Sequence, residues 1–260
     1  MSDLPDGTRA ADYAYLREAD RAGLVWEWLR RDAAYVGWYV RASSATGGNP
    51  PAASRWQLLF AEDPAVTAPQ ARLFWRADVD PGALRVIARA TGARDPAGLP
   101  FHRLGRFLSV VHDTSGGEHA LLSDGFHHIR LDVEEGTLAA GPVLLHYLLD
   151  GLRDADVKFE TVRRLAGLCQ ARRFSPALFP ADPYRDRCLL LLRVGDAIRA
   201  GASQRDVAIL LVGADRVRDE WQGRSDALRS RVRRPVAEVR RLAAGGYRML
   251  LRSEGRERWE

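Results

Sequence analysis

Residues 202–251 read ASQRDVAILLVGADRVRDEWQGRSDALRSRVRRPVAEVRRLAAGGYRMLL, and this stretch predicts a series of helices. Ser203 is a good helix N-cap, with Asp206 three residues later in a weaker form of the capping box. Gly213 then predicts a tight turn before a second helix. A short capped helix, a glycine turn and a further helix are typical of a helix-turn-helix, in which the first helix supports the second against a DNA duplex. The same spacing also occurs in helical bundles that bind no DNA.

A longer amphipathic helix is predicted from Ser225 onward. Its apolar stripe consists of Leu228, Val232, Val236, Val239, Leu242 and Ala243. The six arginines that precede Leu242 fall into rows: Arg229, Arg233 and Arg240 on one flank, Arg234 and Arg241 in a second row, and Arg231 at the other border of the stripe. The basic residues are therefore sorted rather than scattered.

Two interpretations of these arginines are open. A solvated helix normally mixes acidic and basic residues, but only Asp226 and Glu238 oppose the six arginines here. Like charges then repel unless an anion neutralises them, so we favour contact with DNA phosphates. Acidic residues from other elements could also supply the pairing. Arginine suits base recognition as well, because its planar fork can contact guanine O6 and N7 together.

Pro235 predicts either a kink or a break in this helix, because proline removes the hydrogen bond to the carbonyl of Arg231 and clashes with that turn. Both options would bend the arginine rows. The shorter segment ADRVRDEW at 214–221 is an alternative DNA-reading helix, with the helix from Ser225 as its support. We prefer the helix from Ser225 because it is longer and more basic.

The charge distribution agrees with a polyanion partner. The net charge is +5, and residues 184–260 hold 18 arginines against 11 acidic residues, so the basic excess is C-terminal. Arginine abundance alone carries little information, because Lys158 is the only lysine in the chain. Cys169 and Cys188 are expected to be reduced, mostly buried thiols. Neither a secretory signal nor a membrane-spanning run is apparent, so a cytoplasmic location is expected.

The whole chain predicts an α+β fold with a helical N-terminal module, a central antiparallel β-meander and a C-terminal helical bundle that contains a helix-turn-helix variant. The expected domains are 1–98, with a linker at 43–54, and 99–260, whose helical part spans about 141–252.

Individual elements follow from hydrophobic periodicity. Residues 11–42 predict one or two helices, 56–60 and 71–80 predict strands, and 81–90 predicts a short helix. Alternation over 106–134 predicts the three-stranded meander, and 141–152, 157–173 and 184–201 predict helices.

Aromatic residues are concentrated near the N-terminus. They are Tyr13, Tyr15, Trp26, Trp28, Tyr35, Trp38 and Tyr39. Core packing is the default interpretation. The alternative is a partner surface formed by Trp26, Trp28, Tyr35 and Trp38, because tryptophan and tyrosine are enriched at binding hot spots.

The chain resembles two domain families. Residues from about 141 to 251, ending in RRLAAGGYR, look like the RovC-type DNA-binding domain of proteobacterial transcription regulators, and this is the more specific resemblance. WEWLRRDAAY at 26–35, EDP at 62–64 and LFWRADVDP at 73–81 resemble the transcriptional-regulator-like domain that often precedes it. The resemblance implies an activator of type VI secretion genes, or of excision and transfer genes on integrative conjugative elements. It also implies possible oligomers on DNA and, in some relatives, an opposing antiactivator protein.

The resemblance places the DNA-contacting region on two segments of this chain. The candidate residues are Ser203, Gln204, Arg205, Ser225, Arg229, Arg231, Arg233, Arg234, Arg240 and Arg241. The predicted function is sequence-specific binding of promoter DNA, with activation of transcription. The alternative is an antiactivator-like module that binds another regulator and not DNA.

Catalytic and metal-binding functions are not expected. Adjacent strand residues point to opposite faces, so His127 and His128 cannot easily share one ion. Neither a GxSxG elbow nor a phosphate-binding glycine loop occurs, and no cofactor is predicted. A distant third possibility is an enzyme centred on His127 and Asp132.

Overall fold

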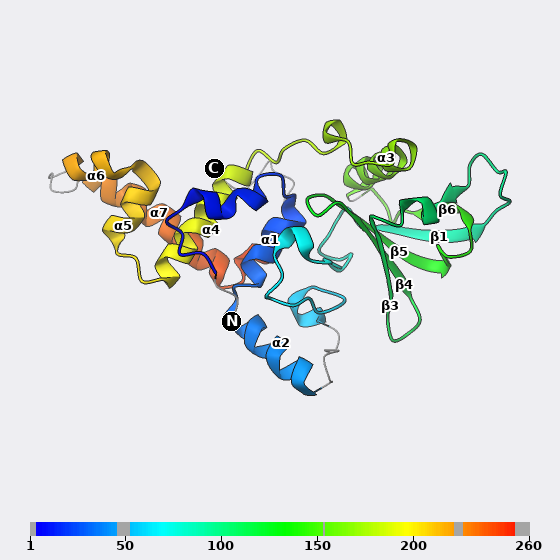
Figure 1. Cartoon of the computed structure of the whole chain (residues 1–260), viewed down its shortest axis with the longest axis horizontal. Helices are drawn as coiled ribbons and strands as arrows, with labels where there is room; N and C mark the ends of the chain where they lie inside the picture. Colours follow the sequence, from blue (N-terminus) through cyan, green and yellow to red (C-terminus); the bar gives the residue numbers. More distant parts are fainter. Residues whose placement is uncertain (1–3, 46–52, 153, 221–225, 253–260) are drawn as a thin grey trace.

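A computed structural model describes residues 4–45, 53–152, 154–220 and 226–252, and leaves the side chains of residues 219–231 undescribed. The molecule is elongated, with helices from both ends of the chain at one end and the β-sheet at the other (Figure 1). This mixed α/β architecture confirms the predicted fold class: N-terminal helices, a central sheet and C-terminal helices.

The helices and strands have the following bounds. The helices are α1 Arg21–Leu29, α2 Ala33–Ala45, α3 Ala155–Ala171, α4 Arg185–Arg199, α5 Gln204–Val212, α6 Ala214–Glu220 and α7 Asp226–Ala243. The strands are β1 Leu84–Ala90, β2 Leu99–Pro100, β3 Leu108–His112, β4 Glu118–Ser123, β5 His128–Gly136 and β6 Pro142–Leu148. Short 3-10 segments, including Ala10–Leu16, connect several of them.

The sheet has six strands in the order β2-β6-β1-β5-β4-β3. Strands β3, β4 and β5 form the predicted antiparallel meander. Strand β1 pairs in parallel with β5 and antiparallel with β6, so the sheet as a whole is mixed. Helix α3 covers the sheet, and its Leu165 and Leu168 are buried in the sheet core (Figure 1).

Two helix predictions were wrong. Residues 81–90 and 141–152 contain the strands β1 and β6, which pair with each other through six residues each, from Arg85 opposite Leu148 to Ala90 opposite Val143. Short apolar runs do not distinguish a strand from a buried helix, and tertiary pairing decided both cases. The strands predicted at 56–60 and 71–80 were also wrong, because they share only an isolated bridge between Leu58 and Trp75.

The structure contains two hydrophobic cores. The helical core combines N-terminal side chains such as Trp26 and Leu29 with C-terminal ones such as Val232 and Leu242. The sheet core draws on residues from Leu84 to Phe174. Each of the two cores contains residues from both 1–98 and 99–260. The division of the chain into these two domains stays a prediction.

Helix α4 lies at the centre of the helical core, between α1 and α7. Its Gly195 makes this possible, because a Cβ there would meet Trp28 of α1 at 3.3 Å and Val239 of α7 at 3.4 Å. Those distances leave little room for a side chain, so an alanine would require Trp28 to shift by a few tenths of an ångström. Side chains of the N-terminal helix and of the arginine-bearing helix thus meet at one glycine of α4.

Buried charges join α1 to α4. The fully buried Glu27 accepts hydrogen bonds from the hydroxyl of Tyr15 (3.0 Å), from Arg30 (3.2 Å) and from Arg31. Arg31 also donates to the buried Asp196 of α4 at 2.9 Å. Burial opposes the charged form of Arg31, but Glu27 and Asp196 more than offset this and raise its pKa. Pairing with Glu27 and Asp196 thus stabilises the charged form of Arg31 at the junction between α1 and α4.

Both cysteines are free and half-buried, and burial raises the pKa of each thiol to about 11. At pH 8 such a thiol is only about 0.1% thiolate, against roughly a quarter for an ordinary cysteine of pKa near 8.5. We therefore expect Cys169 and Cys188 to react with Ellman's reagent about a hundredfold more slowly in the native protein than in denaturant. Rapid reaction of either thiol in the native protein would contradict this.

Candidate nucleic-acid interface

The segment from Ser203 to Gly213 folds as the sequence predicts. Ser203 caps α5: its hydroxyl accepts a hydrogen bond from the Asp206 backbone N–H (3.3 Å), while its own N–H donates to the Asp206 carboxylate (2.9 Å). Gly213 has φ +90° and is the single residue between α5 and α6. Helix α5 packs against α6 and α7, and these helices form the helical end of the molecule (Figure 1).

Gly213 gives a test of this turn. With φ +90° and ψ 154° it lies in a region that is essentially restricted to glycine. A Cβ at this position would meet open space, so the cost of Gly213→Ala is backbone strain and not a clash. We expect Gly213→Ala to lower the free energy of unfolding by about 1–3 kcal/mol, measured by urea denaturation. An unchanged midpoint would show that the turn has another conformation in solution.

Helix α7 runs through Pro235 as one helical segment. The break considered from the sequence is therefore not found. Pro235 lies on the buried face together with Val232, Val239 and Leu242. The proline ring is thus buried, whereas the two arginines directly before it, Arg233 and Arg234, are exposed. Ala243, assigned to the stripe from the sequence, is exposed.

The solvent-exposed face of α7 is basic. The side chains of Arg233, Arg234, Arg240 and Arg241 are all exposed. Within the described part of the chain, Arg233, Arg234 and Arg240 form no ion pair with a carboxylate. At 100° per residue, these arginines surround the exposed Ala237 on one side of the helix. The result is a positively charged face on which three arginines, Arg233, Arg234 and Arg240, have no carboxylate partner among the residues that the structure describes.

Glu238 does not neutralise this face. Its side chain is only 13% exposed and pairs with Arg187 of α4. The acidic residue in the C-terminal half of α7 thus helps attach the helix to α4, while the neighbouring arginines face solvent. The sequence could not reveal this pairing, because Arg187 is 51 residues away along the chain.

Only some of the other predicted DNA-contacting residues lie in the described part of the chain. Ser203, Gln204 and Arg205 are exposed at the start of α5. Ser225 lies outside the described residues, and the side chains of Arg229 and Arg231 are not described either. The set remains a prediction that rests most firmly on the described arginines of α7.

Helix α6 is a weaker candidate for the reading helix. It spans seven residues, and its Arg218 pairs with Asp215 at 3.2 Å. The charges within Ala214–Glu220 are two arginines against three acids, so the helix carries no basic excess. This balance favours α7, in agreement with the preference drawn from the sequence.

The predicted aromatic partner surface requires correction. Trp26, Trp28 and Tyr35 are at most 6% exposed, and the Tyr35 ring packs edge-on against Trp26 at 5.7 Å and Trp56 at 5.4 Å. Trp38 is half-buried against the same core. The first three side chains stabilise the helical core and are not available to a partner: Trp26 and Tyr35 bond to the backbone oxygens of Val66 and Glu62, and Trp28 lies against Gly195 of α4.

The histidines considered as metal ligands bond to separate carboxylates. His127 Nδ1 lies 3.0 Å from Asp124, and His128 Nδ1 lies 3.0 Å from Asp20. In the described ranges, no group of three or more potential ligands is placed to hold a metal ion. Nor is any described helix both long and apolar enough to cross a bilayer.

Comparison with protein families finds domain matches over two segments of the chain, and together they indicate a transcriptional regulator with a DNA-binding domain. Residues 149–252 match the RovC DNA-binding family, described as a T6SS transcription factor DNA-binding domain, and residues 6–61 match the proteobacterial transcriptional regulator-like domain. Both resemblances predicted from the sequence are confirmed. The N-terminal match ends before the EDP and LFWRADVDP segments. A search of curated proteins gave no significant match.

The two matched segments share the helical core, and the Glu27–Arg31–Asp196 network connects them. The sheet, by contrast, lies mostly between the two matches along the chain. The regulator-like segment is therefore part of the structure that holds α4 and α7 in place.

Proposed function

We propose that the protein binds duplex DNA sequence-specifically and activates transcription, with the exposed face of α7 on the DNA and α5–α6 as a helix-turn-helix variant beside it. The exposed arginines of α7 contact phosphates, and one or two of them read base edges in the major groove. The protein positions DNA and partner proteins in the cytoplasm and catalyses no reaction. It requires no cofactor for this role.

One observation carries the proposal. Arg233, Arg234 and Arg240 are exposed without a carboxylate partner among the described residues, while Glu238 of the same helix turns inward to Arg187. Side chains that were merely solvated would be expected to alternate with acids on the same face. A polyanion is the natural ligand of such a face, because each phosphate contact releases a counterion.

The capped α5 adds a second point of contact. Its N-terminus carries the positive end of the helix dipole, and Gln204 and Arg205 are exposed there. In helix-turn-helix proteins, helices that flank the reading helix contact the phosphate backbone. We propose the same role for Ser203 to Arg205, which would fix the orientation of α7.

The biological setting follows from the family resemblance. Control of type VI secretion genes, or of excision and transfer genes on a mobile element, is proposed. Oligomers on DNA and contacts with the transcription machinery or an antiactivator protein are part of the same proposal.

The test is binding of the full chain to the DNA upstream of its own gene, followed by fluorescence anisotropy across a salt series. A scrambled duplex of the same length and composition is the control. Engagement of about four to six phosphates predicts a slope of log K against log salt near −0.9 per contact, that is, about −4 to −5. Equal affinity for both duplexes would contradict sequence specificity. No binding to either would favour the alternative of a module that binds another regulator.

A further inference from the structure

A large cavity lies away from the arginine face. Its volume is about 760 Å³, and its lining comes from α1, the loop before β1, the start of β5, α3, the 176–183 connection and the first residue of α4. Ligand pockets for small molecules typically span about 300–1,000 Å³, so this cavity has the size of a metabolite site. It lies where the helical core, the sheet and α3 meet.

His128 supplies a buried polar group in this cavity. Its side chain is 5% exposed, its Nδ1 lies 3.0 Å from the Asp20 carboxylate, and its Nε2 is buried without a hydrogen-bond partner. Burial lowers the pKa of His128, but the Asp20 carboxylate outweighs it and the net pKa is raised. When the ring is protonated, both of its nitrogens carry a proton, and Nε2 is then a buried donor with no hydrogen-bond partner among the described residues. A buried donor without an acceptor is rare in folded proteins and requires an explanation.

Asp80 supplies the complementary group. Its carboxylate accepts a hydrogen bond from the backbone N–H of Gly82 at 3.0 Å and forms no ion pair with any described residue. Burial raises the pKa of Asp80, although the nearby charges of Arg130 and His128 oppose this shift. A cationic or hydroxyl donor from a ligand would compensate the carboxylate charge.

Arg185 adds a second donor at the start of α4. It lines the cavity, and its Nε is buried without a hydrogen-bond partner, while its nearest described carboxylate, Asp186, is 3.9 Å away. The cavity thus offers two buried nitrogen atoms without a hydrogen-bond partner and one carboxylate without an ion pair among the described residues. A ligand with both an anionic and a cationic group would satisfy all three.

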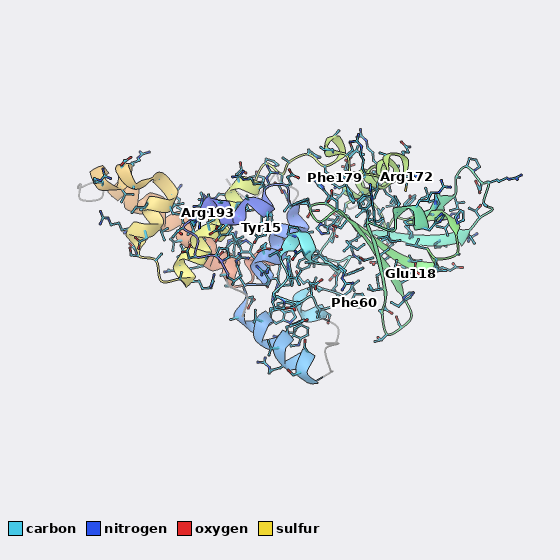
Figure 2. All side chains as sticks on the ribbon, in the orientation of Figure 1. Tyr15, Phe60, Glu118, Arg172, Phe179 and Arg193 are labelled. Atoms are coloured by element: carbon cyan, nitrogen blue, oxygen red, sulfur yellow. The ribbon has the colours of Figure 1, made fainter. Side chains whose placement is uncertain are left out.

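Part of the cavity lining is apolar. It comes from the 174–183 segment FSPALFPADP, of which Phe179 and the prolines Pro176, Pro180 and Pro183 line the cavity, together with Asp182, which pairs with Arg21. Phe179 is labelled in Figure 2, on the connection between α3 and α4. Its ring also packs on His127, with centroids 4.6 Å apart. Such a lining would accept the hydrocarbon part of a ligand.

We propose that this cavity binds a free amino acid, whose carboxylate accepts hydrogen bonds from His128 and Arg185 and whose ammonium group pairs with Asp80. The side chain of the ligand packs against Phe179 and the prolines. The site is separate from the DNA-binding face and does not depend on it. Because the lining includes α1 and α4, occupancy stabilises the junction between the two family-matched segments.

The test is thermal unfolding of the full chain with each proteinogenic amino acid at millimolar concentration. At a concentration a hundredfold above its Kd, a bound amino acid raises the Tm by roughly 5 °C. Isothermal titration calorimetry with the responsive amino acid then gives its Kd. If no amino acid shifts the Tm, the proposal is overturned and the buried polar groups are satisfied by water alone.

Asp80→Asn is the decisive variant, because asparagine keeps the acceptor for the Gly82 N–H and removes only the charge. Asp215→Asn is the matched control: it removes the same charge from a side chain that is 92% exposed and outside the cavity lining. We expect Asp80→Asn to weaken binding at least tenfold and Asp215→Asn to leave it unchanged. Equal affinity of Asp80→Asn and the control would overturn the proposal. Should Asp80→Asn fail to fold, Arg185→Gln gives the same comparison.

Discussion

Replacement of Arg233 and Arg240 by alanine should weaken binding to the upstream DNA about tenfold or more at physiological salt. Both side chains are exposed on the same flank of α7 and have no carboxylate partner among the described residues. Their removal deletes two proposed phosphate contacts without leaving a buried charge behind. The slope of log K against log salt should therefore become shallower by about 1.8.

The matched control replaces Arg89 and Arg94, two exposed arginines at the sheet end of the molecule, by alanine. This control changes the net charge equally, so it separates a local contact from a general electrostatic effect. Affinity and salt slope should stay close to those of the unmodified protein. If both double variants lose affinity to the same extent, α7 has no special role and the proposed interface is wrong.

Glu27→Ala should destabilise the helical core by about 3–5 kcal/mol. Glu27 is fully buried and neutralises Arg30 and Arg31, so alanine leaves two buried guanidinium groups with too few acceptors. It also removes the acceptor of the Ala68 backbone N–H, 2.9 Å away. Urea denaturation followed by tryptophan fluorescence reports this core directly, because Trp26, Trp28 and Trp56 are buried in it.

Asp186→Ala is the comparison for this change, since its carboxylate is exposed and its loss should alter stability by no more than about 0.5 kcal/mol. A Glu27→Ala protein as stable as this control would show that the ion pairs of Glu27 with Arg30 and Arg31 do not stabilise the core in solution. The loss of core stability should also reduce DNA binding, because α1, α4 and α7 share one packing arrangement around Gly195.

Local signals in the sequence predicted the C-terminal half of the fold well. The Ser203–Asp206 capping box, the turn at Gly213 and the buried stripe of Val232, Val239 and Leu242 are all present. These features depend on residues within one or two helical turns, so periodicity and capping chemistry suffice to find them.

Features that depend on distant pairing were missed. Strands β1 and β6 were predicted as helices, although each supplies the other with hydrogen bonds across more than fifty residues of chain. The burial of Trp26 and Tyr35 likewise depends on the 53–79 segment, to which both are hydrogen-bonded, and that of Trp28 depends on α4. Nothing in the sequence near an aromatic residue states which distant segment will cover it.

The cavity at His128 also has no local signature. Its lining residues are spread along the chain from Glu18 to Leu251, and only the folded structure brings them together. The sequence singled out His127 and His128 as potential metal ligands, but it could not show that the Nδ1 atoms bond to Asp124 and Asp20. The sorted arginines of α7, by contrast, were visible as a pattern, and the structure adds that Glu238 is turned away from them.

The most direct measurement is photo-cross-linking from Ala237, an exposed residue that lies among Arg233, Arg234 and Arg240 on α7. A photoreactive amino acid at this position, and another at the exposed Ala139 beyond β5 as a control, are irradiated with labelled upstream DNA. We expect a cross-link to DNA from position 237 and none from position 139. DNA that binds the protein without cross-linking to position 237, or that cross-links equally from both positions, would contradict the central claim that this face of α7 contacts DNA.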